Sequence, residues 1–170
     1  EFDLSDGGVT KVDMNGRGDI EHIFISSPLA VIGRSMTAAD GAGWGFYVAY
    51  RTPLNVWETV VIPASLLAGD GREMRELLAH RGVTFGQSRS ERQGLMEYIG
   101  YAQTNDIVEV ATRSGWNGES FVMPGRVISA EGAPRILPPE DNSAQHYFQT
   151  SGTFEQWRGL SAEVAGSSRV

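Results

Sequence analysis

The fold is decided by the stretch WGFYVAYRTPLNVWETVVI, which occupies residues 44–62. Phe46, Val48 and Tyr50 are two residues apart, so they fall on one face of a β-strand over residues 44–51. Residues 52–55 turn the chain, and residues 56–62 form a second strand rich in β-branched and aromatic side chains. Another strand is predicted over residues 29–37, and the short connections between the three indicate an antiparallel meander.

Two helices are predicted after this meander. Residues 63–67 form a single helical turn, and Asp70 and Glu73 have the spacing of a capping box for a helix that Gly82 ends. The second helix begins near Ser88 or Ser90 and continues to about residue 103. Apolar residues at helical spacing mark the buried sides, namely Met74, Leu77 and Leu78 in the first helix and Leu95, Met96, Ile99 and Ala102 in the second.

A hairpin is predicted between strands over residues 107–110 and 121–123. Asn117 and Gly118 tolerate the positive φ of a tight turn, and Pro124 ends the second strand because it lacks an N–H group. Trp116 lies beside the turn, where its ring can fold over one face as a core anchor. We expect this core role; the alternative is that Trp116 stacks on a nucleobase.

The chain is therefore expected to have an α+β fold, with an antiparallel meander and hairpins, two central helices and a C-terminal helix. We assign residues 1–8 to an extra or disordered start, 9–130 to the main domain, 131–152 to a connector and 153–170 to the C-terminal helix. The last helix has an apolar stripe that needs a partner surface, formed by Phe154, Trp157, Leu160 and Val164.

Composition limits the classes of protein that remain. The chain of 170 residues has no cysteine, which excludes disulfides and thiolate metal sites. The lack of cysteine favours an intracellular origin, so we expect a cytoplasmic protein. No apolar run approaches the roughly 20 residues of a membrane helix, so we expect no membrane partner. The net charge of −7 argues against a dedicated duplex-DNA binder, because phosphate contacts dominate that affinity.

No catalytic motif is found. The surroundings of Lys11, the sole lysine, do not match a phosphate-binding P-loop, and a dinucleotide fingerprint and a Gly-x-Ser-x-Gly turn are both missing. His22, His80 and His146 are far apart in the sequence. We therefore expect no catalytic residue, metal or cofactor in this fragment.

Five arginines lie within 21 residues across the two predicted helices: Arg72, Arg75, Arg81, Arg89 and Arg92. Because Glu73, Glu76 and Glu91 lie among them, we expect pairing within the helices on a solvated surface. The alternative is a positive face for DNA phosphates or for an acidic neighbouring subunit.

Several separated landmarks together resemble one protein family. They are residues 26–29 (SSPL), 44–45 (WG), Pro63 with 66–71 (LLAGDG), 95–99 (LMEYI), 115–118 (GWNG), 121–124 (FVMP) and 152–157 (GTFEQW). Their order and spacing resemble the N-terminal half of the family called domain of unknown function 927. That family is found in phage, plasmid and genomic-island proteins that are often described as helicases or linked to primases.

The resemblance implies a two-part protein whose C-terminal half, absent here, is an ATPase with a P-loop. This chain would then be a non-catalytic N-terminal domain that assists DNA engagement or oligomer assembly, within a full-length protein that is an ATP-dependent helicase. DNA, the protein's own ATPase region and further copies of the chain are the expected partners. A protein–protein interaction module without nucleic-acid binding is the alternative, and an independent nuclease or hydrolase is a third hypothesis.

Overall fold

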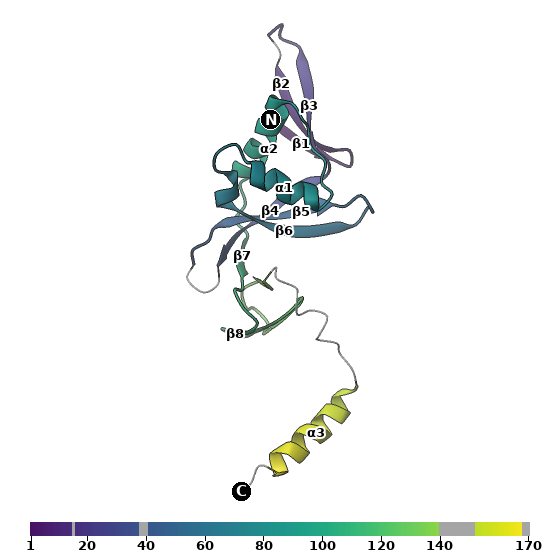
Figure 1. The fold of residues 1–170 in the computed structure, drawn as a ribbon, viewed down its shortest axis with the longest axis vertical. Helices are drawn as coiled ribbons and strands as arrows, with labels where there is room; N and C mark the ends of the chain where they lie inside the picture. The colour runs from purple at the N-terminus through teal and green to yellow at the C-terminus, as the bar shows by residue number, and fades with distance from the viewer. Residues whose placement is uncertain (15, 38–40, 140–151, 168–170) are drawn as a thin grey trace. The chain divides into compact units, whose positions relative to one another are not determined.

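A computed structural model describes residues 1–14, 16–37, 41–139 and 152–167 of the chain (Figure 1). The chain divides into two compact units, residues 1–139 and residues 140–170.

The central sheet of the first unit contains the predicted meander. Strands β4 (Leu29–Thr37), β5 (Gly45–Arg51) and β6 (Trp57–Pro63) pair antiparallel in sequence order. Val48 and Tyr50 on β5 are buried on the same face, as their two-residue spacing predicts. The α+β fold class and the meander are therefore confirmed.

The central sheet is extended by two strands that pair in parallel. Strand β7 (Ile107–Val110) lies beside β4, and β11 (Ile136–Leu137) lies beside β7. The predicted hairpin between residues 107–110 and 121–123 is therefore wrong. Parallel pairing with β4 is accessible because the long connection from β4 to β7 contains both helices and can cross over the sheet.

A second sheet contains the start of the chain. Strands β1 (Phe2–Ser5), β2 (Gly8–Met14) and β3 (Ile20–Ser26) pair antiparallel. Residues 2–5, which we expected to lie outside the domain, are thus a paired strand. Phe2 packs against Tyr98 with ring centroids 5.3 Å apart, which gives this strand a contact with the helical layer.

The helical layer follows the meander. A single turn η1 (Ala64–Leu67) leads to α1 (Arg72–His80) and α2 (Arg89–Gly100). The predicted capping box at α1 is wrong: its N-cap is Gly71, and the side chain of Asp70 accepts a hydrogen bond from the backbone N–H of Arg72 instead. A capping box is present at α2, where Ser88 and Glu91 satisfy each other's backbone N–H groups.

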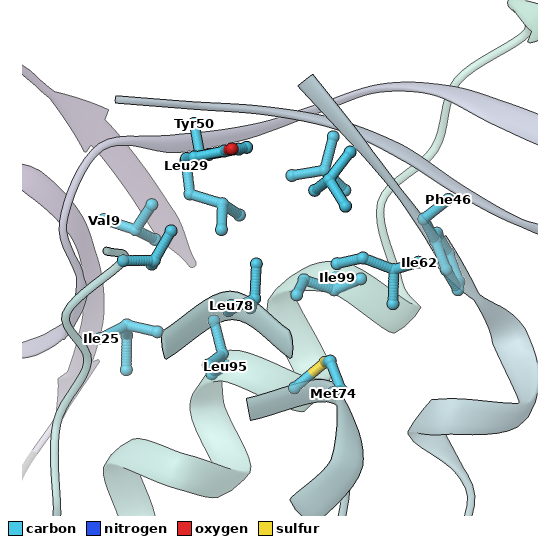
Figure 2. Close-up of a cluster of buried hydrophobic side chains, with 13 residues drawn as sticks. Val9, Ile25, Leu29, Phe46, Tyr50, Ile62, Met74, Leu78, Leu95 and Ile99 are labelled. Carbon is cyan, nitrogen blue, oxygen red and sulfur yellow. The ribbon is translucent and has the colours of Figure 1, made fainter. Parts of the chain in front are cut away.

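The main core lies between the meander and the two helices, and the N-terminal sheet also contributes to it (Figure 2). Met74 and Leu78 from α1 and Leu95 and Ile99 from α2 are fully buried. Other fully buried members come from the sheets and include Val9, Ile25, Leu29, Val48 and Ile62. The predicted apolar stripes of both helices thus face the core, except for Ala102, which follows the end of α2 at Gly100 and not at the predicted residue 103.

A third, smaller sheet follows β7. Strands β8 (Gly115–Asn117), β9 (Ser120–Met123) and β10 (Arg126–Ser129) pair antiparallel, with β9 in the centre. A turn connects β8 to β9 close to the predicted position, but Asn117 is the last paired residue of β8 and the turn begins at Gly118, which has the expected positive φ of 55°. Strand β9 ends at Met123, directly before Pro124.

The second unit contributes α3 (Phe154–Ser167), which begins close to the predicted position. Of the connector predicted over residues 131–152, residues 136–137 form β11, and residues 140–151 lie outside the described part of the chain. No helix among the described residues is both long and apolar enough to span a membrane.

The meander leaves no room for a side chain at Gly45. A Cβ atom there would lie 2.6 Å from the carbonyl oxygen of Ile62 and 2.7 Å from Oγ of Ser35. We expect Gly45→Ala to lower the free energy of unfolding by about 1–3 kcal/mol through overpacking, measured by urea denaturation. Gly16→Ala is the matched control because an added Cβ there meets no atom within 4 Å. Equal stability of the two variants would contradict this packing.

An ion pair between Lys11 Nζ and Glu97 Oε2, 2.9 Å apart, joins β2 to α2. The hydrogen bond from Lys11 lowers the pKa of the Glu97 carboxyl. This stabilisation is therefore present above the carboxyl's unfolded pKa and is lost as the pH falls through the lowered folded pKa. Because the pair is partly exposed, we expect Glu97→Gln to cost roughly 0.5–1 kcal/mol at neutral pH.

The difference in unfolding free energy between the wild type and Glu97→Gln should start to shrink as the pH falls below about 4.3, the pKa of an unfolded Glu carboxyl, and should vanish below the lowered folded pKa. Urea denaturation at neutral and acidic pH checks this. Glu73→Gln serves as control, since Glu73 is exposed and forms no ion pair within the described part of the chain. A difference that persists unchanged in acid would assign the effect to packing.

Candidate nucleic-acid interface

The structure separates the five arginines into different environments. Arg72 Nε donates a hydrogen bond of 2.8 Å to Glu76 Oε1 one turn later on α1, so the predicted pairing within a helix is confirmed for this residue. Arg81 lies near the buried Tyr50 hydroxyl. Burial raises the pKa of Tyr50, its hydrogen bond to Glu58 adds to this rise, and the Arg81 guanidinium lowers it.

Arg75, Arg89 and Arg92 line one open hollow of about 430 Å³, which we call the arginine hollow. One arginine comes from α1 and two come from α2. The remaining lining residues are Gly69, Asp70, Gln93 and Met96. The structure therefore brings together three of the five arginines singled out in the sequence, and two segments of the chain contribute to the same surface.

The charges of the arginine hollow are only partly compensated. Arg75 donates a hydrogen bond to the backbone oxygen of Asp70, and its guanidinium lies 3.7 Å from the Asp70 carboxylate. Among the described residues, no carboxylate forms an ion pair with Arg89 or Arg92. The hollow thus has two guanidinium groups available for an anion, and the planar fork of arginine matches the oxygens of a phosphate.

Local backbone features hold the arginine hollow in shape. Gly71 has a φ of 66° and lies against Met96, whose sulfur would be 2.8 Å from an added Cβ. This close approach joins the start of α1 to the middle of α2. The capping box of Ser88 fixes the first turn of α2, which contains Arg89 and Arg92.

Asp70, Gln93 and Met96 are not among the residues predicted for this surface, although the sequence contains a signal for part of it. Arg89, Arg92, Gln93 and Met96 are spaced by three, one and three residues. Such positions lie along one side of an α-helix. Asp70 joins this surface because of how α1 packs against α2. This packing cannot be predicted from residue spacing within one helix.

Trp116 does not have the predicted role of a core residue. It is 76% exposed, so the expectation of a core anchor is wrong. Its ring packs edge-on against Phe121, with centroids 5.2 Å apart. The core beneath this sheet is formed instead by Ala111, Val122 and Ile136 on the opposite face.

In the second unit, the apolar stripe of α3 is exposed. Phe154 and Trp157 stack with ring centroids 5.7 Å apart, and both are exposed, as is Leu160. Val164 lies within the helix, but its side chain is outside what the structure describes. This apolar stripe therefore presents aromatic surface that the described residues of this unit do not cover.

Metal ligands do not cluster in the part of the chain that the structure describes. Within the described ranges, no group of three His, Asp or Glu side chains is arranged to hold a metal ion. The polar residues of the arginine hollow are suited to bind an anion through hydrogen bonds and charge.

A comparison with curated proteins finds no significant match. The family model described as domain of unknown function (DUF927) matches residues 2–170, which is nearly the whole chain, and the protein therefore belongs to this family.

Proposed function

We propose that this chain is a non-catalytic domain of a cytoplasmic mobile-element helicase or ATPase and that it engages DNA through phosphate contacts. The observation that carries the DNA contact is the convergence of Arg75, Arg89 and Arg92 on one open hollow. The association with a helicase rests on the resemblance of the sequence landmarks described above.

Phosphate is the ligand that best fits the arginine hollow. Arg89 and Arg92 are exposed on consecutive turns of α2 and have no carboxylate partner among the described residues. Two guanidinium groups on one helix face can contact neighbouring phosphates of a strand. Gln93 lies on the same side, and its amide donates a hydrogen bond to Glu97. Asp70 partly balances Arg75, which leaves the positive charge concentrated on α2.

The overall acidity of the chain limits where DNA can bind. A net charge of −7 opposes binding to most of the surface, because phosphates are repelled by carboxylates. A local cluster of uncompensated arginines overcomes this repulsion only over a short range in salt. The proposed contact is therefore small and involves few phosphates.

Replacing both free arginines tests the proposal directly. We expect Arg89→Ala/Arg92→Ala to weaken binding to single-stranded and forked DNA and to reduce the slope of log K against log salt by about 1.4 on single strands, about 0.7 per lost phosphate contact. Fluorescence anisotropy over a salt series, starting at low ionic strength, measures both quantities.

Arg72→Ala is the matched control. It removes one positive charge from the neighbouring helix and so matches either single replacement, Arg89→Ala or Arg92→Ala, but Arg72 is paired with Glu76 and lies outside the arginine hollow. Binding that is equally weakened by the control, or unchanged in the double variant, would rule out the arginine hollow as the DNA site. Circular dichroism of each variant verifies that α2 is retained.

A second candidate function, assembly with another copy of the chain, is favoured by the exposed row on α3. Phe154, Trp157 and Leu160 recur at helical spacing, which is the pattern of a helix that packs against a partner helix. The stacked pair of aromatic rings would supply the centre of such an interface.

We expect light scattering of the chain to show a dimer or larger assembly that Trp157→Ala shifts toward the monomer. Removing a central aromatic residue from an interface typically costs about 2 kcal/mol or more, which is a roughly 30-fold weaker association. Trp57→Ala, an exposed tryptophan on β6, is the control. A chain that is monomeric at all concentrations would contradict assembly through α3.

A further inference from the structure

The outer face of the β8–β9–β10 sheet has an apolar row that crosses all three strands. Trp116 is paired with Phe121 across β8 and β9, and Phe121 is paired with Ile128 across β9 and β10. We call these three residues the aromatic row. Trp116 is 76% exposed and Ile128 is 51% exposed, so both ends of the row are open to a ligand.

The opposite face of this sheet explains why the aromatic row points outward. Val122 is fully buried and packs with Ala111 and Ile136, with Val127 beside them. Because side chains alternate along a strand, the burial of Val122 places Phe121 on the other face. The hydrogen bond between Ser120 Oγ and Ser129 Oγ, 2.8 Å long, fixes the register of β9 and β10.

Charge near the aromatic row favours an anionic ligand. Met123 pairs with Arg126 on the same face, so the five positions of this face hold one arginine and no carboxylate. Arg126 therefore gives these five positions a single positive charge, in a chain whose net charge is −7. Glu119, the acidic residue nearest to Trp116 in sequence, lies in the turn outside these positions.

We propose that this face binds single-stranded nucleic acid, with a base stacked on Trp116 and the backbone phosphate near Arg126. An exposed indole supported at its edge by Phe121 offers a flat surface to any base. Duplex does not offer this contact, because its bases are already stacked on one another. The inference rests on the proposed function in taking nucleic acid as the ligand, and it adds a second site and a preference for single strands.

The size of the face argues against a protein partner as its main occupant. Three strands about 4.8 Å apart, each contributing up to four residues of about 3.4 Å, make a surface of roughly 10 by 13 Å. A stable protein interface buries about 800 Å² on each partner, several times this area. One or two nucleotides, in contrast, fit on a platform of this size.

Substitution of Trp116 tests the inference on the whole chain. We expect Trp116→Ala to weaken binding of fluorescein-labelled oligothymidine about tenfold while binding to a duplex of equal length stays unchanged. The salt slope should also stay unchanged, because stacking releases no counterions. Trp116→Tyr retains an aromatic ring and should keep most of the affinity, which separates stacking from a folding defect.

Trp57→Ala, which removes another exposed tryptophan from a different sheet, should bind as the wild type does. Oligouridine in place of oligothymidine identifies whether the ligand is RNA or DNA. Equal single-strand affinity of Trp116→Ala and wild type would overturn the inference, yet the proposed function would survive if Arg89→Ala/Arg92→Ala still weakens binding. A wild-type chain that binds neither single strands nor forked DNA would overturn both.

Light scattering tests whether another copy of the chain occupies the aromatic row. If Trp116→Ala dissociates an oligomer of the wild-type chain, the aromatic row is an interface between copies, and the inference is wrong.

Discussion

Burial of the apolar face of the β4–β5–β6 meander is the constraint on which the first unit depends. Val48, Tyr50 and Ile62 on this face are almost entirely shielded from water, and α1 and α2 supply the side chains that cover them. The helices follow the meander directly in the chain, and they pack on this apolar face. Because they intervene between β4 and β7, the chain can return to the sheet in parallel beside β4.

The arginine hollow follows from the same packing. One side of α2 faces the core through Leu95 and Ile99, and Gly94 allows Ile25 of β3 to approach the helix closely. The ion pair of Glu97 with Lys11 holds another side of the helix to β2. The flank toward the start of α1 remains open, and this flank carries Arg89, Arg92 and Gln93.

The sequence predicted the elements whose signals are local. Alternation in residues 44–62 identified the meander, and apolar spacing identified the buried sides of both helices. The pairing of β7 could not be predicted, because its partner β4 lies some 70 residues earlier and a four-residue strand fits either neighbour. Similarly, α1 starts with Gly71 at its N-cap because Asp70 bonds to Arg72 and Arg75, and no local pattern distinguishes this from a capping box.

The role of Trp116 was mispredicted for a related physical reason. Residues 121–123 are all apolar, so alternation does not reveal which of Phe121 and Val122 faces inward. The small core of Ala111, Val122 and Ile136 has room for aliphatic side chains, and the aromatic residues are left on the other face. A single choice of face therefore decides whether Trp116 is structural or available to a ligand.

The arginine hollow and the face around Trp116 share one property that matters in an acidic chain. In a protein with a net charge of −7, unspecific attraction to a polyanion is weak, and contacts must come from places where carboxylates are missing or already paired. The arginine hollow meets this condition because Asp70 is engaged with Arg75. The face around Trp116 meets it because the strand positions there hold no carboxylate at all. On the two proposals, the first surface would bind phosphate charge and the second would stack exposed bases, so together they would distinguish an open strand from a duplex, which charge alone cannot do.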